Sequence, residues 1–305
     1  MASLKAYLLA TRPWSFTVSL LPPVFGLLIA IIDVAGLQVD WFKFVLTLAG
    51  CNLAHSGANA LSDYFDFKTR VDREGTYGSS GMLVSQRMTP AEMLRWALIL
   101  YAAAGVIGLY LILTAANPLL LIALVTVGFT LGFFYTMTPF NFKYHALGDI
   151  GVFLTFGLLI PLGSYAVQTG LFSVKPLLWC IPAALLVDAI LHSNNLRDIP
   201  FDKAVRIKTV PILIGERGAQ TMYYVLVLGA YALIPLLILF AGLTWLSLLV
   251  FLSFPLALRN IRTVRSKNDM PIEQFAGIDA ATAQLHLIFG LLFSAALVCR
   301  IFFLS

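Results

Sequence analysis

Residues 42–72 read FKFVLTLAGCNLAHSGANALSDYFDFKTRVD, an apolar run that ends in a dense group of charges. Within 42–62 only Lys43 is charged, whereas 63–72 holds three aspartates and two basic side chains. A run of about 20 mostly apolar residues is the length that a membrane-spanning helix needs. The stretch therefore predicts a spanning helix with a charged end.

The composition extends this prediction to the whole chain. Of 305 residues, 60% are hydrophobic and 11% are charged, and the mean hydropathy is +0.89. A soluble domain carries about 25% charged residues. These values exclude a soluble monomer, a disordered chain and a nucleic-acid-binding domain, because such proteins need a dense pattern of solvated charge. We expect an all-α, polytopic membrane protein in contact with the lipid bilayer.

Nine segments have the length and composition of spanning helices. Only Ala116 and Asn117 separate the third from the fourth, and only Gly242 separates the seventh from the eighth, so these pairs are expected to form tight hairpins. The chain is interpreted as a single domain over residues 1–305. The segments lie near 15–33, 42–62, 93–115, 118–138, 146–168, 175–195, 220–241, 243–258 and 283–304.

Basic residues favour one side of the predicted membrane. With nine spans, 17 of the 20 lysines and arginines fall on the side of the N-terminus, and the others are Lys43, Lys175 and Arg300. By the positive-inside rule, the N-terminus and the aspartate-rich loops are cytoplasmic and the C-terminus lies outside. The first segment lacks a cleavage pattern and is interpreted as a retained span of a cell-membrane protein.

Two helix ends on the predicted cytoplasmic side carry the same polar pattern. Each has an asparagine followed by two aspartates on one helix face: Asn59, Asp63 and Asp66 after the second segment, and Asn195, Asp198 and Asp202 after the sixth. His55 and His192 each lie about one turn earlier, and Asp188 extends the second stripe inward. The spacing suggests an internal repeat of 1–140 in 141–305. Ionisable groups at this depth usually face a bundle interior and mark function.

The two stripes suit a particular chemistry. Carboxylate and amide oxygens are hard ligands for Mg²⁺, which proteins often hold with one or two carboxylates and the phosphates of a substrate. Nearby bases could bind phosphate oxygens, although each is also explained by membrane topology alone. These bases are Lys68, Arg70, Arg197, Lys203 and Lys208. The pattern predicts a diphosphate at the membrane surface with its apolar tail inside the bundle.

The two acidic stretches resemble known motifs. Residues 59–72 and 194–203 resemble the two aspartate-rich motifs of the UbiA superfamily of intramembrane aromatic prenyltransferases, and Ala189 to Asp198 resembles its menaquinone-forming branch. Thr11-Arg12-Pro13-Trp14, Tyr135 with Pro139, and Gly148-Asp149 add to the resemblance, which covers most of the chain. Ser62 departs from the usual Asn of the first motif, and Arg206 from the Gly that commonly follows the second.

The resemblance implies a UbiA-type bundle around a central cavity and transfer of a prenyl chain to an aromatic acceptor, 1,4-dihydroxy-2-naphthoate in menaquinone biosynthesis. It implies Mg²⁺ bound by Asp63, Asp66, Asp198 and Asp202, with Asn59 and Asn195 assisting and Asp72 as a further ligand. Tyr135 is expected either to face the allylic cation or to anchor the chain at the membrane interface. Asp188 and His192 are expected either to contact the acceptor or to hold two helices together as a buried pair. No obligate protein partner is implied.

Alternatives remain open from the sequence. The acceptor could be 4-hydroxybenzoate, homogentisate, haem or a glycerol phosphate ether. A cation-coupled transporter also carries acids in its membrane helices, although usually near the midplane. A CDP-alcohol phosphotransferase is disfavoured because Phe67, not glycine, follows Asp66. Glycines 75, 78 and 81 predict a mobile lid within residues 72–86.

Overall fold

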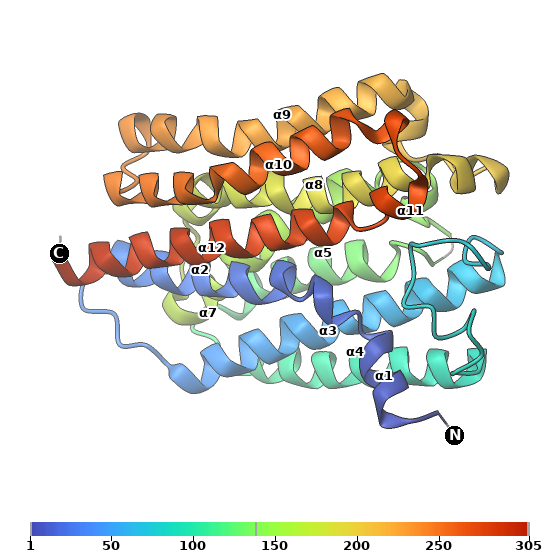
Figure 1. Cartoon of the computed structure of the whole chain (residues 1–305). Helices are drawn as coiled ribbons and strands as arrows, with labels where there is room; N and C mark the ends of the chain where they lie inside the picture. Colours follow the sequence, from blue (N-terminus) through green and yellow to red (C-terminus); the bar gives the residue numbers. More distant parts are fainter. Residues whose placement is uncertain (1, 138, 304–305) are drawn as a thin grey trace.

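A computed structural model describes residues 2–137 and 139–303, and these ranges are helical with no β-strand. Figure 1 shows the long helices running roughly parallel or antiparallel to one another. The α-helices are α1 (Leu4–Ala10), α2 (Thr17–Asp33), α3 (Trp41–Lys68), α4 (Pro90–Leu113), α5 (Pro118–Phe133), α6 (Gly148–Val152), α7 (Ile160–Thr169), α8 (Val174–Ala204), α9 (Val210–Phe240), α10 (Phe254–Arg265), α11 (Ile272–Phe275) and α12 (Ile278–Phe303). Shorter 3-10 or π segments are η1 (Pro13–Ser15), η2 (Phe142–Tyr144), η3 (Phe153–Leu159), η4 (Trp245–Ser253) and η5 (Lys267–Asp269).

The nine predicted segments coincide with helices, but nine spans are not confirmed. Among the described residues, six helices are long and apolar enough to cross a membrane, or seven if the segment bent by 58° between Leu4–Ser15 and Thr17–Asp33 is one span. The helix α5 has 16 residues, which is shorter than a typical span. The helix α3 is long enough, but polar residues such as Asn52, His55 and Asn59 reduce its hydropathy.

Two apolar cores hold the bundle together. The larger core joins α2, α8, α9 and α12 around Phe25, Trp179 and Phe289, and the smaller joins α1, α3 and α4 around Leu61 and Met93. Within the described chain, α4 and α5 contribute no residue to the larger core.

Small residues allow some of these helices to approach closely. A Cβ on Gly26 of α2 would lie 2.1 Å from the carbonyl oxygen of Pro161, and one on Gly157 would lie 2.3 Å from Cβ of Ala184. No larger side chain fits at either position without moving a helix.

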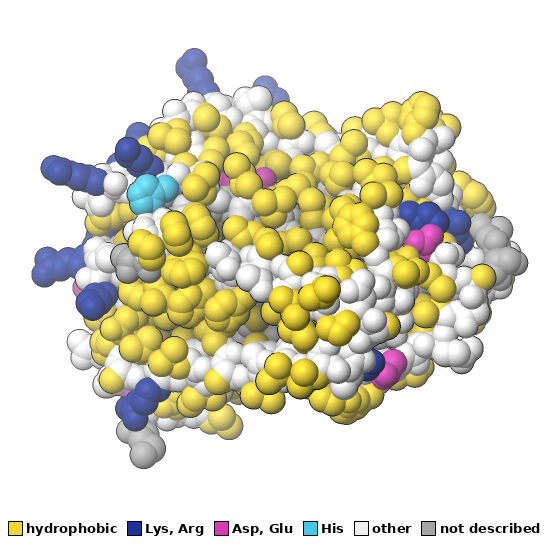
Figure 2. Space-filling model, turned by 180° about the vertical axis from the view of Figure 1, so that it is seen from behind, with side chains coloured by type: hydrophobic (Ala, Val, Ile, Leu, Met, Phe, Trp, Pro, Cys, Tyr) yellow, Lys and Arg dark blue, Asp and Glu magenta, His cyan; other side chains and the backbone are white. Residues whose placement is uncertain are grey.

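The outer surface is largely apolar. Figure 2 shows hydrophobic side chains over most of one face, with lysine and arginine side chains gathered mainly at its left edge. Exposed apolar side chains include Val106 and Leu113 of α4 and Leu239 and Phe240 of α9. With several apolar helices long enough to span a bilayer, the molecule is a multi-pass membrane protein.

The carboxyl ends of α3 and α8 lie at the same end of the bundle, on the right in Figure 1. The loop after α3 lies at this end as well, whereas the last turns of α12 lie at the opposite end. The fold thus brings together two acidic stripes that lie more than a hundred residues apart in the chain.

Candidate active site

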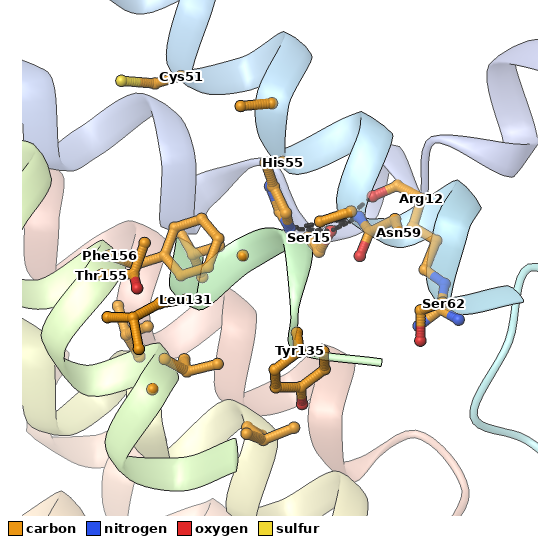
Figure 3. Close-up of a pocket in the computed structure, with 18 of the residues that line it drawn as sticks. Arg12, Ser15, Cys51, His55, Asn59, Ser62, Leu131, Tyr135, Thr155 and Phe156 are labelled. Atoms are coloured by element: carbon orange, nitrogen blue, oxygen red, sulfur yellow. Dashed lines mark hydrogen bonds between the residues drawn. The ribbon is translucent and has the colours of Figure 1, made fainter. Parts of the chain in front are cut away.

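One cavity of about 820 Å³ connects the acidic end of the bundle to its interior. Its walls are formed mainly by α3, α4, α5, α7 and α8, and they are mostly apolar except at the end near the acidic stripes. Figure 3 shows His55, Asn59, Tyr135 and Phe156 around this space. An apolar chamber with convergent polar groups at one end is typical of a ligand site.

Asp63 of α3 is held by residues from two other segments. Its Oδ1 accepts a hydrogen bond from Arg12, which precedes η1, and its Oδ2 accepts hydrogen bonds from the backbone N–H of Ser80 at 3.1 Å and from the Ser80 hydroxyl. The Asp63 side chain is 2% exposed. The loop after α3 therefore folds back over the carboxylate, where the sequence predicts a lid.

Asp66, one turn further along α3, has a basic and a phenolic partner. Its Oδ2 accepts from Lys143 Nζ at 2.6 Å and from Ser62 Oγ at 2.9 Å, and its Oδ1 accepts from Tyr144 OH at 2.6 Å. The Asp66 carboxylate raises the pKa of Lys143 above its ordinary value, although burial by itself lowers it. Lys143 and Asp66 therefore form a buried ion pair.

Backbone contacts place Lys143 at this position. Its N–H donates to the carbonyl oxygen of Tyr135 at 2.8 Å, so the chain after α5 folds back. The same loop pairs with the loop between α8 and α9, since the N–H of Ala146 donates to the carbonyl oxygen of Lys208 at 2.8 Å. Lys208 thus supports the site through its backbone, while its side chain is exposed.

Asp72 reaches the same site through the end of α3. Arg70 adopts a left-handed conformation (φ 62°), and the Asp66 carbonyl oxygen then accepts from the N–H groups of Val71 and Asp72 at 2.8 and 3.1 Å. The Asp72 side chain lines the cavity, and its Oδ2 is buried without a hydrogen-bond partner. Burial, reinforced by the Asp66 charge, raises the pKa of Asp72 to about 7.

The acidic residues of α8 lie on the opposite wall of the cavity. Asp198 accepts a bidentate pair of hydrogen bonds from Arg197, at 2.8 Å from both Nε and Nη2. Asp202 lines the cavity and is 8% exposed, and it has no ion pair within the described ranges. Asp63 and Asp66, in contrast, face their partners and do not line the cavity.

Arg197 is almost fully buried and connects α8 to the start of α12. Its Nη1 donates to the Ala276 carbonyl oxygen at 3.0 Å and to Asp279 Oδ2 at 2.9 Å, and its Nη2 also donates to Asn194 Oδ1 at 2.7 Å. The guanidinium lies 5.7 Å from the centre of the Tyr77 ring in the loop after α3. Arg197 therefore fixes the mouth of the cavity from several directions.

The α8 helix ends like α3. Arg206, four residues after Asp202, has φ 60°, and the Ile207 N–H donates to the Asp202 carbonyl oxygen at 3.1 Å. Arg70 stands in the same position relative to Asp66. A left-handed conformation favours glycine, which is the residue that the resemblance leads one to expect here, so Arg206 adopts a backbone conformation that suits glycine better.

The two asparagines line the cavity but bind different partners. Asn59 donates from Nδ2 to the Thr11 carbonyl oxygen at 3.0 Å and lies 3.2 Å from His55 Nε2. Asn195 donates from Nδ2 to Asp149 Oδ2 over 3.5 Å. Each amide nitrogen is thus used within the protein.

His192 and Asp188 do not line the cavity. His192 is fully buried, with Nδ1 3.1 Å from Asp149 Oδ1 and Nε2 2.9 Å from the Ala219 carbonyl oxygen, so it connects α8 to α6 and α9. Asp188 Oδ1 is buried without a partner. Tyr135, in contrast, lines the cavity beside Gly148.

Of the five bases that the sequence singles out, only Arg197 lines this cavity. Lys68 and Arg70 lie by a separate shallow surface depression, and Lys203 and Lys208 are exposed. The structure instead brings Arg12 and Lys143 to the acidic residues. Arg12 precedes the first predicted span, and Lys143 is the one lysine or arginine between the fourth and fifth segments. The sequence shows both positions, but it does not show that these side chains pair with aspartates.

The donor set fits Mg²⁺ held together with a diphosphate. Among the described residues, no three His, Cys, Asp or Glu side chains form a ready metal cage. Mg²⁺ does not need one, because it usually keeps several waters and binds one or two carboxylates with substrate phosphates. Asp72 and Asp202 line the cavity with carboxylate oxygens that the described protein groups do not saturate.

Residues 9–299 match the UbiA prenyltransferase family. The chain is 33% identical over 295 residues to 1,4-dihydroxy-2-naphthoate octaprenyltransferase of Bacillus subtilis, which covers 96% of this chain and 92% of that protein. It is 34% identical over 292 residues to UbiA prenyltransferase domain-containing protein 1 of Xenopus tropicalis, covering 96% and 81% of the two chains.

Solved structures share the fold. A UbiA homologue from Archaeoglobus fulgidus bound to GPP and Mg²⁺ superposes with a TM-score of 0.61 at 15% identity, over 95% of this chain and 99% of that one. A digeranylgeranylglyceryl phosphate synthase structure gives a TM-score of 0.60 at 18% identity, over 97% and 98%. The match along nearly the whole sequence and the shared helical architecture lead to one conclusion: the chain is a transferase that belongs to the UbiA prenyltransferase family.

Proposed function

We propose that this protein transfers a prenyl chain from an allylic prenyl diphosphate to 1,4-dihydroxy-2-naphthoate, with Mg²⁺ as cofactor, in menaquinone biosynthesis. The observation that carries the proposal is one continuous cavity that joins carboxylates and a buried arginine at one end to an apolar chamber. The similarity to the Bacillus subtilis octaprenyltransferase supports this choice of acceptor.

The carboxylates and amides of the two stripes are the proposed metal-binding groups. They are Asp63, Asp66, Asp72, Asp198 and Asp202, with Asn59 and Asn195. When bound, Mg²⁺ would neutralise negative charge on the leaving diphosphate as a Lewis acid. Asp72 and Asp202 already line the cavity.

The proposed diphosphate-binding bases are those at the cavity rather than the exposed ones. Arg12, Lys143 and Arg197 all line the cavity, and Arg12 also contacts Asp63. Fixed cations in a site from which water is excluded stabilise charge that develops in the transition state. Lys68, Arg70, Lys203 and Lys208 are left as surface charges of the membrane boundary.

The reaction breaks the carbon–oxygen bond between the prenyl chain and the diphosphate, and leaves an allylic cation. A ring carbon of the acceptor attacks this cation to form the new carbon–carbon bond, and the carboxyl group of dihydroxynaphthoate departs as carbon dioxide. The apolar walls keep water from the cation. Tyr135 and Phe156 line the cavity and offer aromatic faces, which attract cations.

For Asp188 and His192 the sequence leaves two roles open, acceptor contact or a buried link between helices, and we propose the second for His192. Neither lines the cavity, and His192 contacts Asp149, which contacts Asn195 in turn. We therefore assign His192 to positioning Asn195, and neither His192 nor Asp188 to binding the acceptor.

Orientation in the membrane follows from charge. Basic residues gather on the loops at the end of the bundle where the acidic stripes lie. By the positive-inside rule this end, with the N-terminus, faces the cytoplasm, and the end of α12 faces outward. Polyprenyl diphosphate would then enter from the cytoplasmic side.

The direct test uses purified protein in lipid nanodiscs with Mg²⁺, a prenyl diphosphate and a panel of acceptors. Mass spectrometry should detect the prenylated, decarboxylated naphthoquinol and release of diphosphate, and both should disappear with EDTA. Product with 4-hydroxybenzoate or homogentisate but not dihydroxynaphthoate would reassign the acceptor. A transporter would instead be favoured if the protein carried cations into vesicles and formed no prenylated product. The same flux would then be retained in the double variant Asp66→Asn with Asp198→Asn.

A further inference from the structure

The outer face of α10 changes from apolar to basic along the helix axis. Pro255, Leu258, Arg259, Arg262 and Arg265 are all exposed. A helix turns by about 100° per residue, so these five positions fall within one arc of about 120°. The two apolar residues come first, and the three arginines occupy the last two turns. The helix thus presents one outward face with an apolar part and a basic part.

The opposite face of α10 is fixed by the neighbouring helices. Ala257, Asn260 and Val264 are buried. Asn260 Nδ2 donates to the Ala281 carbonyl oxygen of α12 at 3.1 Å. From the other side, Gln220 Nε2 of α9 donates to the Val264 carbonyl oxygen at 3.2 Å. These contacts hold the helix in one orientation, so the arginines stay on the outer surface.

The three arginines of this face have no acidic partner within the described chain. Residues 254–268 contain no aspartate or glutamate. Glu216 of α9, which reaches the segment after α10, is already paired with Lys267. The face therefore carries three positive charges that no described protein group neutralises.

Membrane topology alone does not require this arrangement. The positive-inside rule asks for basic residues on one side of the membrane, but not for a cluster that lacks acids and lies on one helix face. Two other basic clusters on the same predicted side include or adjoin acids, since 68–73 contains Asp72 and 203–208 follows directly on Asp202. The α10 cluster is also all arginine, whose planar guanidinium can bind two oxygens of one phosphate.

The arginines lie at the depth of the lipid headgroups. The apolar segment Trp245–Arg265 is long enough to span a membrane and ends at Arg265. Figure 1 shows this end of α10 at the same end of the bundle as the loop after α3. Arg259 lies six residues before Arg265, or about 9 Å deeper, and a long arginine side chain reaches the interface from such a depth. Phe251 and Leu252, deeper still, are exposed and apolar.

We propose that the outer face of α10 binds an anionic phospholipid, with its phosphate at the three arginines and an acyl chain along Leu258, Phe251 and Leu252. Charge complementarity favours this occupant, because a cluster of basic side chains at the membrane surface attracts anionic headgroups. The apolar part of the face favours a lipid over free phosphate, since only the lipid contacts both parts. No residue of α10 lines the cavity, so the inference is independent of the proposed function.

The test measures lipid binding to the purified protein in detergent. Native mass spectrometry gives the affinities for phosphatidylglycerol and for phosphatidylcholine with the same acyl chains. Thermal unfolding is followed in parallel with each lipid and with inorganic phosphate, because a ligand that binds only the folded state raises the unfolding midpoint. In detergent, the variants cannot act by changing the orientation of the chain in a membrane.

The main variant combines Arg259→Gln, Arg262→Gln and Arg265→Gln. Wild-type protein should bind phosphatidylglycerol at least about tenfold more tightly than phosphatidylcholine, and this variant should lose the preference to within about twofold. Arg262→Gln alone, at the centre of the row, should weaken phosphatidylglycerol binding by about fivefold and provides a second reading if the triple variant does not fold.

The matched control combines Lys5→Gln, Arg87→Gln and Arg95→Gln. These residues are exposed and belong to the same predicted side, so the control removes equal charge from elsewhere on that surface. It should keep the wild-type preference for phosphatidylglycerol. Without added lipid, both triple variants should unfold at the wild-type midpoint.

Four results would overturn the inference. They are equal affinity of wild-type protein for the two lipids, an unchanged preference in the α10 variants, an equal loss in the control, and a rise of the unfolding midpoint with inorganic phosphate as large as that with phosphatidylglycerol. The last result would mean that the arginines bind a phosphate ion rather than a lipid.

Discussion

The acidic stripes on α3 and α8 have nearly the same sequence spacing but different surroundings. On α3, Asp63 and Asp66 contact bases from distant segments, Arg12 and Lys143, and both carboxylates are turned away from the cavity. On α8, Asp198 is paired by its own neighbour Arg197, and Asp202 faces the cavity.

The α3 carboxylates hold separate segments together, whereas Asp202 of α8 faces the cavity. The shared sequence pattern does not distinguish these two roles. The α3 carboxylates tie the N-terminal segment, the loop after α3 and the loop after α5 to one point. Within the described chain, Asp202 of α8 makes no such contact between segments. Substitutions on α3 should therefore reduce stability as well as activity, whereas Asp202 should affect activity alone.

The largest effect is expected for Asp202→Asn. Loss of one charge-stabilising group in an active site typically reduces kcat by about 100- to 1000-fold, and prenyl transfer should fall by this amount. The midpoint of thermal unfolding should stay the same, because no ion pair is broken. A stability loss like that of Asp66→Asn would contradict the comparison.

Asp66→Asn should lower both activity and stability. The change leaves Lys143 with an uncompensated charge in a site where Asp66 is 1% exposed. Breaking one partner of a buried pair costs about 3 kcal/mol or more. Unfolding in detergent measures this cost, and Lys143→Met in the Asp66→Asn background should restore part of the stability without restoring activity.

The Arg12–Asp63 pair should show coupling across the bundle. In a double-mutant cycle with Arg12→Gln and Asp63→Asn, we expect an interaction free energy of about 2 kcal/mol, because the residues contact each other directly. A substitution of the exposed Lys203, combined with Asp63→Asn, provides the control. In that pair the two changes in unfolding free energy should add. If the free-energy changes of Arg12→Gln and Asp63→Asn were additive, the two side chains would not interact in the purified protein.

The smallest effect is expected for Tyr144→Phe. Its hydroxyl donates to Asp66 at 2.6 Å, and a hydrogen bond to a charged group contributes about 1.5 kcal/mol at the low end. The substitution removes only the oxygen, so the fold should persist with a slightly lower unfolding midpoint. Tyr64→Phe, on the same helix as Asp66 but outside this network, should leave the midpoint unchanged.

Much of the architecture could be predicted from the sequence. Apolar runs of fixed length placed the helices, because a bilayer requires such runs. Nine spans were not confirmed, since α5 is short and α3 carries polar residues inside the bundle. The lining of the cavity by Asn59, Asp72, Asn195, Asp198 and Asp202 agrees with the expected polar site, and their metal-binding roles remain proposals.

The internal repeat also stays a prediction, although the two acidic helices end alike. Arg70 and Arg206 both take left-handed conformations four residues after an aspartate. His55 and His192, at matching positions, have different partners, since His55 contacts Ser19 and His192 contacts Asp149. Local chain geometry thus agrees between the halves, and tertiary contacts do not.

The sequence by itself determined the helical membrane fold, the family and the two acidic helix ends, because hydrophobic length and side-chain spacing along one helix are local properties. Only the tertiary structure decided that Lys143 and Arg12 pair with the α3 aspartates and that His192 does not line the cavity. Those outcomes depend on which helices become neighbours, and the free energy of burying a charge depends on atoms that lie far away in the chain.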